Sequence, residues 1–188
     1  AAARGAAKSL QAGEVLIPAS ASSEDVLRIL LSGMTVVRRL TVVEGLTTAE
    51  VINRLLRVKG LTGKISSIPG EGRLLPETYH FSYGDSREGL LQRMRVAMDN
   101  VLGELWVKRK AGVPYKNPTE ALVMASIVER ETGLAEERAK VAGVFVNRLN
   151  RGMRLQSDPT VIYGLMGTSG SLGRRLTRKD LTNKHAYN

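Results

Sequence analysis

Two glutamates at the end of an apolar helix are the residues best suited to acid–base chemistry. Glu129 and Glu131 stand in the run Ala-Ser-Ile-Val-Glu-Arg-Glu-Thr-Gly, residues 125–133. A carboxyl group among apolar neighbours holds its proton more tightly, which suits it to act as a general acid near neutral pH. Chemistry at either glutamate would indicate a hydrolase-like or lyase-like active site.

Helical phase separates the two acids, because an α-helix turns by about 100° per residue. The apolar face of this helix contains Met124, Ile127 and Val128. Glu131 falls within that face and Glu129 falls outside it. We therefore expect Glu131 to be partly desolvated and Glu129 to be solvated or ion-paired. The helix alone leaves open a structural role for Glu131, such as an ion pair with Arg148 or Arg154.

Neutral polar side chains are concentrated between residues 147 and 163. Gln156, Ser157 and Tyr163 offer hydrogen-bonding groups and an aromatic face, as sugar-binding sites do. Asn147 is either a further contact or a helix-surface amide. Asp158 precedes a proline and is interpreted as an N-cap.

Glu71 lies between two glycines, which predicts a flexible or tightly turned approach. A loop residue and a substrate contact are equally compatible with this position.

The composition favours chemistry that rests on a carboxylate. The 188 residues are 43% hydrophobic, as in a globular protein, and contain no cysteine and only two histidines, far apart in sequence. Phosphate-binding loops, serine nucleophile elbows and zinc-binding helix motifs are absent. We therefore expect no metal and no organic cofactor.

The net charge of +10 favours an acidic partner such as nucleic acid, an anionic membrane surface or an anionic cell-wall glycan. The positive residues are spread along the chain, and the aromatic content of 4% is too low for a base-stacking platform. These features disfavour a nucleic-acid-binding protein, which stays an alternative class.

The pattern of elements predicts an α+β fold. Strands are expected at 14–18 and 34–43, and helices at 22–33 and 47–57, each helix opening with a capping box. A domain boundary is placed in the glycine-rich stretch 59–72, giving units 1–66 and 67–188. The second unit is expected to be mostly helical: an extended segment at 73–81, helices at 85–110, 117–132 and 136–150, a short helix from 158, and a loop at 164–173.

Five motifs, kept in order along the chain, resemble one known family. They are Gly70–Tyr79 (GEGRLLPETY), Ala125–Thr132 (ASIVERET), Val144–Leu149 (VFVNRL), Gly152–Gly164 (GMRLQSDPTVIYG) and Ala186–Asn188 (AYN). Together they look like the bacterial endolytic murein transglycosylases, the MltG or YceG-like family. The run QSDPTVIY is highly specific, whereas the N-terminal part matches more loosely.

The resemblance implies a LysM-like module followed by a lysozyme-like catalytic domain with short strands. It implies cleavage of nascent peptidoglycan within the strand, at the MurNAc–GlcNAc β-1,4 bond, leaving 1,6-anhydro-MurNAc ends and terminating glycan elongation. The catalytic glutamate of the family falls on Glu131, and Thr132 after it fits. The expected substrate contacts are Gln156, Ser157, Tyr163, Glu71, Tyr187 and Asn147.

The resemblance also implies the partners and the location. The expected partners are peptidoglycan glycan strands and cell-wall synthases (penicillin-binding proteins), with no nucleic acid. A single-pass inner-membrane anchor would precede Ala1, the body would be periplasmic, and the catalytic domain would continue past Asn188. A non-catalytic peptidoglycan-binding protein stays the main alternative.

Overall fold

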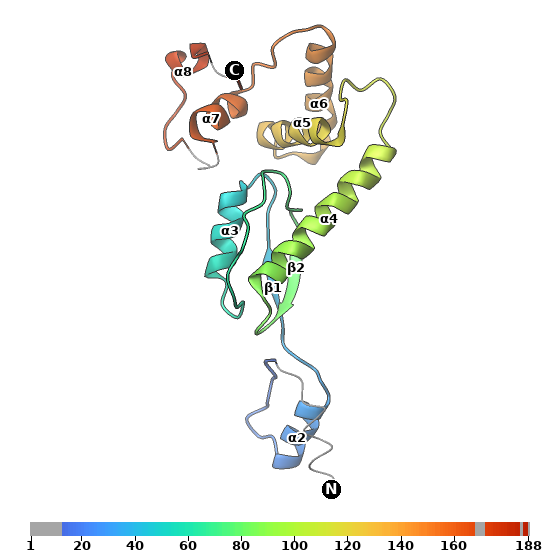
Figure 1. Ribbon diagram of the computed structural model, residues 1–188, viewed down its shortest axis with the longest axis vertical. Coiled ribbons are helices and arrows are strands. Elements are labelled where there is room, and N and C mark those ends of the chain that lie inside the picture. Colours follow the sequence, from blue (N-terminus) through green and yellow to red (C-terminus); the bar gives the residue numbers. More distant parts are fainter. Residues whose placement is uncertain (1–12, 168–171, 185, 188) are drawn as a thin grey trace.

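The computed structural model describes residues 13–167, 172–184, 186 and 187, and these form an elongated molecule in three tiers (Figure 1). Helix α2 lies at one end, a two-stranded sheet with α3 and α4 lies in the middle, and helices α5 to α8 lie at the other end. The elements are α2 (Ser23–Leu31), β1 (Val37–Thr41), α3 (Thr48–Arg57), β2 (Thr78–Ser82), α4 (Arg87–Val107), α5 (Pro118–Glu131), α6 (Ala135–Asn150), α7 (Asp158–Met166) and α8 (Arg178–Thr182). Helices combined with a small sheet agree with the predicted α+β class.

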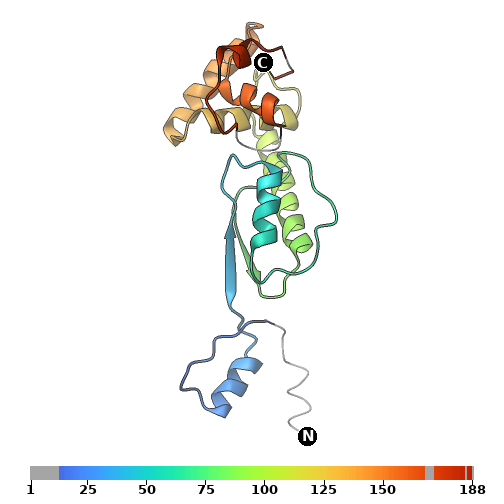
Figure 2. The same cartoon turned by 90° about the vertical axis from the view of Figure 1, so that its left-hand side faces the viewer.

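The sheet joins two strands that are far apart in sequence. β1 pairs antiparallel with β2, in a register that runs from Val37 opposite Ser82 to Thr41 opposite Thr78. On β2, Tyr79 and Phe81 are buried, as the two-residue period of a strand with one covered face requires. Helices α3 and α4 lie side by side on one side of the sheet (Figure 2).

The larger core fills the space between the sheet and these two helices. It consists of Val42, Val51, Ile52, Leu55, Leu61, Leu74, Tyr79, Phe81, Leu90, Leu91 and Met94. β1 and α3 precede the expected boundary at residues 66 and 67, and β2 and α4 follow it. A division there would therefore separate a paired sheet and cut through one continuous core.

A second, smaller core holds the C-terminal helices together. Met124, Ile127 and Val128 of α5 are buried against Phe145 of α6, and Leu155 packs at the edge. The three buried residues of α5 are those of the predicted apolar face. Among the described residues, no helix is long and apolar enough to cross a membrane.

Capping residues in the sequence correctly predicted where α2, α3 and α5 begin. Ser22 with Asp25 and Thr47 with Glu50 form complete capping boxes, in which each side chain bonds the other's backbone N–H. Asn117 caps α5 and accepts a hydrogen bond from the N–H of Glu120. These three helices begin within one residue of their predicted positions.

Three predictions of local structure were wrong. Residues 14–18 form no strand, although the Glu14 carbonyl accepts a hydrogen bond from the N–H of Val36, at 2.7 Å. Asp158 is the first residue of α7 rather than its cap, because Ser157 occupies the N-cap position. The expected loop at 164–173 is wrong for residues 164–166, which belong to α7, and residues 168–171 lie outside the described residues. Helix α8 was absent from the prediction.

Candidate active site

Glu131 is the last residue of α5 and is exposed to solvent. The expectation that it would be partly desolvated was therefore wrong. Its helical phase matches the buried residues of α5, but the second core ends one turn earlier, at Ile127 and Val128. The carboxyl group thus lies at the rim, where a substrate can reach it.

Glu129 is engaged in an ion pair, as expected from its position outside the apolar face. Its Oε2 lies 3.1 Å from Nη2 of Arg138, and its side chain is 28% exposed. The pair links the end of α5 to the first turns of α6. This contact gives Glu129 a structural role.

Ser157 meets Glu131 across the α5–α7 contact. The Ser157 hydroxyl donates a hydrogen bond of 2.5 Å to Oε1 of Glu131, and Ser157 is only 2% exposed. The side chain makes no capping bond to α7, so its hydrogen bond is directed to Glu131. Because a hydroxyl can both donate and accept, it can accompany Glu131 in its ionised and its protonated forms.

For a reaction that uses Glu131 as its acid, replacing Ser157 by alanine is expected to lower the rate by about 10- to 100-fold, which corresponds to losing a hydrogen bond to a charged group. Stability should change little, because Glu131 is exposed and can bind water instead. Steady-state rates and a thermal melt measure the two effects. Ser126→Ala is the matched control, since that hydroxyl donates to the Val123 carbonyl of its own helix. Equal rates for both variants would remove Ser157 from the site.

Thr132 shapes the turn between α5 and α6. Its hydroxyl donates to Oε2 of Glu137 at 2.8 Å and accepts from the N–H of Leu134 at 3.0 Å. The residue is buried. Thr132 therefore fixes the end of the helix that carries Glu131.

Glu71 closes the N-terminus of α3 from a distant part of the chain. Both its carboxylate oxygens accept from the backbone N–H of Thr48, at 3.0 and 3.2 Å. A carboxylate is stabilising there, because helix N-termini present free N–H groups and a positive dipole end. The adjoining Gly72 packs against Leu122 of α5. The loop thus joins the central tier to the helix bearing Glu131.

A side chain at Gly72 is expected to destabilise the fold. Its φ is +72°, and an added Cβ would lie 2.9 Å from Cδ2 of Leu122, so that side chain would have to shift. Gly72→Ala should therefore lower the free energy of unfolding by at least the roughly 1–2 kcal/mol that a left-handed conformation costs an L-residue. Gly63→Ala, with φ +75° and open space around it, measures the conformational part alone. Equal losses in denaturant titrations would show that the contact with Leu122 is unimportant.

Two predicted aromatic contacts lie together. The rings of Tyr163 and Tyr187 pack edge to face, with centroids 5.2 Å apart and planes at 79°. Burial, the charge of Glu71 and the neighbouring Tyr187 raise the pKa of Tyr163, in that order of size. Glu71 thus lies close enough to Tyr163 to act on it electrostatically.

Gln156 and Asn147, the other two predicted site residues, are both exposed to solvent. Gln156 is exposed, and its Oε1 accepts a hydrogen bond from Nη1 of Arg148 at 3.2 Å. Asn147 is exposed on α6, and in the described part of the chain its side chain makes no hydrogen bond to the other predicted site residues. The sequence suggests Arg148 as a partner for Glu131, whereas the structure places Arg148 against Gln156.

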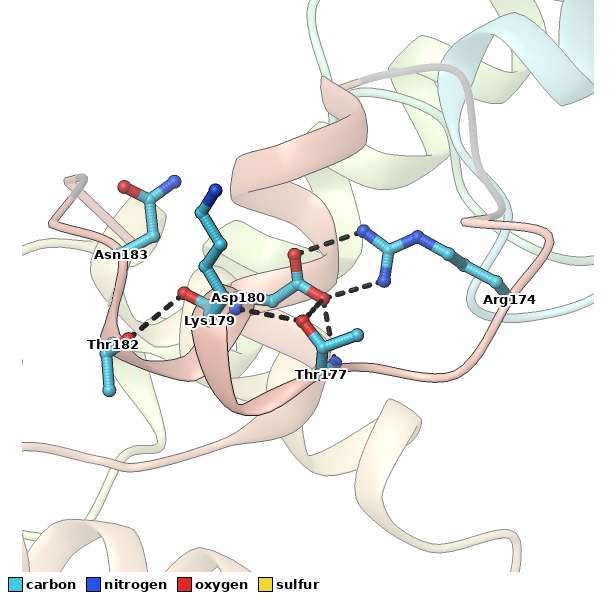
Figure 3. A pocket seen from close by; sticks show the side chains of 6 residues that line it. All are labelled: Arg174, Thr177, Lys179, Asp180, Thr182 and Asn183. Carbon is cyan, nitrogen blue, oxygen red and sulfur yellow. Dashed lines mark hydrogen bonds and ion pairs between the residues drawn. The ribbon is translucent and has the colours of Figure 1, made fainter.

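A separate pocket lies on α8, with a volume of about 510 Å³ (Figure 3). Its lining contains none of the predicted site residues: Arg174, Thr177, Lys179, Asp180, Thr182 and Asn183. Arg174 binds both carboxylate oxygens of Asp180, at 2.7 and 3.0 Å. These bonds, together with those from Thr177, hold the pKa of Asp180 well below its usual range. The pair fastens the loop before α8 to that helix.

The described part of the chain holds no cluster of side chains suited to bind a metal ion. Among residues 13–167, 172–184, 186 and 187, no three histidine, aspartate or glutamate side chains come together in a way that could hold a metal ion. The carboxyl group of Glu131 is a group that can give and take a proton.

The sequence profile of the YceG-like family matches residues 1–188. The chain belongs to the YceG-like family. Among curated relatives, it is 31% identical over 212 residues to an endolytic murein transglycosylase of Streptococcus pneumoniae serotype 2, a match that covers 89% of this chain and 37% of that protein. It is 37% identical over 121 residues to the endolytic murein transglycosylase of Bacillus subtilis, covering 64% of this chain and 32% of the relative.

A solved structure shares the fold of this YceG-like chain. The crystal structure of a yceG-like protein from Listeria monocytogenes superposes with a TM-score of 0.61 at 28% identity, over 99% of this chain and 70% of that one. The chain spans about a third of the length of the curated relatives it matches.

Proposed function

We propose that this YceG-like chain carries the active site of an endolytic peptidoglycan lytic transglycosylase. The observation that carries the proposal is the hydrogen bond from buried Ser157 to exposed Glu131. It gives one carboxyl group a fixed orientation and leaves it open to a polymer. The names of the relatives supply the substrate and the reaction.

The proposed reaction uses Glu131 twice. Protonated Glu131 gives its proton to the glycosidic oxygen between N-acetylmuramic acid and N-acetylglucosamine, and the bond to the leaving sugar breaks. The 2-acetamido group of the substrate stabilises the developing cation. Ionised Glu131 then takes the proton from the C6 hydroxyl, whose oxygen bonds to C1 and closes the anhydro ring. One residue serves as general acid and then as general base.

The geometry of Glu131 fits a residue that changes protonation state during turnover. Ser157 engages Oε1, whereas Oε2 has no hydrogen-bond partner among the described residues. Oε2 is therefore the oxygen we assign to proton transfer. Hydrolysis by the usual pair of carboxyl groups would need a second acid about 5–10 Å away. The acid nearest in sequence, Glu129, is already bound to Arg138.

The remaining predicted residues are proposed as glycan contacts. The Tyr163–Tyr187 pair offers an aromatic edge to a sugar ring, and Glu71 lies near it. The Oε1 atom of Gln156 is bound to Arg148, so its amide nitrogen is the group that would donate to a sugar hydroxyl. Asn147 would contact the strand farther along α6.

The location and partners are extensions of the same proposal. A catalytic domain that acts on nascent glycan works outside the cytoplasmic membrane, held there by a single-pass anchor before this chain. Cell-wall synthases are the proposed partners, because they make the strand that would be cut. The LysM-like module is proposed for the N-terminal part, where it would bind the same glycan.

The experiment is digestion of purified peptidoglycan sacculi, followed by mass spectrometry of the released fragments. The proposal expects new 1,6-anhydro-MurNAc ends within the strands. Fragments with reducing ends would indicate hydrolysis instead. Binding of sacculi without any release would support the non-catalytic peptidoglycan-binding protein.

A further inference from the structure

The segment between α6 and α7, residues 151–157, determines where the Ser157 hydroxyl lies. Its first half turns the chain back after α6: the N–H of Gly152 donates to the Leu149 carbonyl at 3.0 Å, and the N–H of Met153 donates to the Arg148 carbonyl at 2.9 Å. Its last residue donates to Glu131. The backbone of this segment therefore controls the hydrogen bond on which the site depends.

Gln156 adopts a costly backbone conformation directly before Ser157. Its φ is +53°, and it is the only non-glycine residue of the described chain with a positive φ. The Cβ of an L-residue clashes with its own backbone in this region, so such a residue persists only where its surroundings hold it. A return of Gln156 to negative φ would rotate the next peptide group and move Ser157 away from Glu131.

Arg148 makes two hydrogen bonds at Gln156, one to the peptide group before it and one to its side chain. Its Nη1 atom donates to the Leu155 carbonyl at 2.5 Å and to Oε1 of Gln156 at 3.2 Å. The peptide group before Gln156 and the end of its side chain are thus tied to one guanidinium group. Arg148 is half-buried on the last turn of α6 and forms no ion pair with any described carboxylate. Its hydrogen bonds are therefore made to this segment rather than to an acid.

We propose that Arg148 is a positioning residue of the active site: by bonding Leu155 and Gln156, it keeps Gln156 at positive φ and Ser157 against Glu131. Its effect on turnover rests on the proposed function. Arginine suits this role because its planar guanidinium presents several donors in a fixed fork. The ammonium group of lysine is a flexible point charge and would replace these bonds only in part.

A double-mutant cycle in the full-length protein tests the proposal. Arg148→Ala is expected to lower kcat on purified glycan strands by about 10-fold or more, because one hydrogen bond to Glu131 is lost indirectly. The double variant with Ser157→Ala should be no slower than Ser157→Ala alone, since both changes remove the same bond. Multiplying losses would overturn the proposal.

Two further variants keep the cycle decisive. Arg154→Ala removes one positive charge, as Arg148→Ala does, but from an exposed position within residues 151–157. It should leave kcat unchanged. An equal loss in this variant would mean that charge alone matters, which contradicts positioning. Arg148→Lys should lose less activity than Arg148→Ala and is used in the cycle if the alanine variant does not fold.

The NMR chemical shift of the Gln156 Cα atom, which reports the backbone conformation of that residue, separates this proposal from the proposed function. It should move in Arg148→Ala and stay close to the wild-type value in Arg154→Ala. Absence of anhydro ends in the wild-type digest would refute the transglycosylase assignment while leaving this measurement meaningful. An unchanged Gln156 shift in Arg148→Ala would refute positioning, whatever the enzyme does.

Discussion

Glu131→Gln is expected to reduce the release of 1,6-anhydro ends from purified glycan strands by about 100- to 10,000-fold, the range that general acid–base catalysis contributes. Glutamine keeps the shape of the side chain and can still accept from Ser157, but it can neither give nor take the proton. Folding should be unaffected because Glu131 is exposed. Quantitative mass spectrometry of the digest measures the loss.

Glu129→Gln is the matched control, two residues earlier on the same helix. It removes an ion pair with Arg138 that is partly exposed on both sides. Such pairs contribute about 0–1 kcal/mol to the free energy of unfolding. Because the proposed mechanism gives Glu129 no part in proton transfer, turnover should fall by only a few-fold. The reverse ranking of the two variants would move the catalytic role to Glu129. If Glu131→Gln keeps full activity, the proposed mechanism is wrong.

Binding to sacculi distinguishes a lost proton donor from a lost binding surface. Glu131→Gln should still co-sediment with sacculi, because the proposed glycan contacts at Tyr163 and Tyr187 are intact. Loss of binding in that variant would show that Glu131 holds the strand rather than reacting with it.

The parts of the fold that sequence reasoning predicted well are those set by local chemistry. The capping boxes at Ser22 and Thr47 and the Asn117–Pro118 start of α5 each satisfy N–H groups within a few residues. The buried face of α5 followed from helical period alone. Such signals do not depend on the rest of the chain.

The parts that were missed depend on contacts between distant segments. The pairing of β1 with β2 links residues about 40 positions apart. The sequence of each strand carries no signal that identifies the strand with which it pairs. The exposure of Glu131 depends on where the second core ends, which helical phase does not describe. Ser157 was expected only as a sugar contact, and its bond to Glu131 follows from α7 lying against α5.

The strongest consequence of these distant contacts is that the core should unfold as one unit. Leu55→Ala on α3 and Met94→Ala on α4 remove side chains with 0% exposure. Each should lower the free energy of unfolding by about 2–5 kcal/mol, through lost burial and the cavity left behind. Denaturant titrations followed by circular dichroism measure the loss.

Leu56→Ala provides the control, because Leu56 follows Leu55 on the same helix but is 51% exposed, and its loss should cost about 0.5 kcal/mol or less. Leu55 precedes residue 66 and Met94 follows it, so the two substitutions report on opposite sides of the expected boundary. If they share one core, both must shift the same transition, because neither side retains its packing without the other. Two transitions, each sensitive to one substitution only, would instead support a boundary between independently stable units.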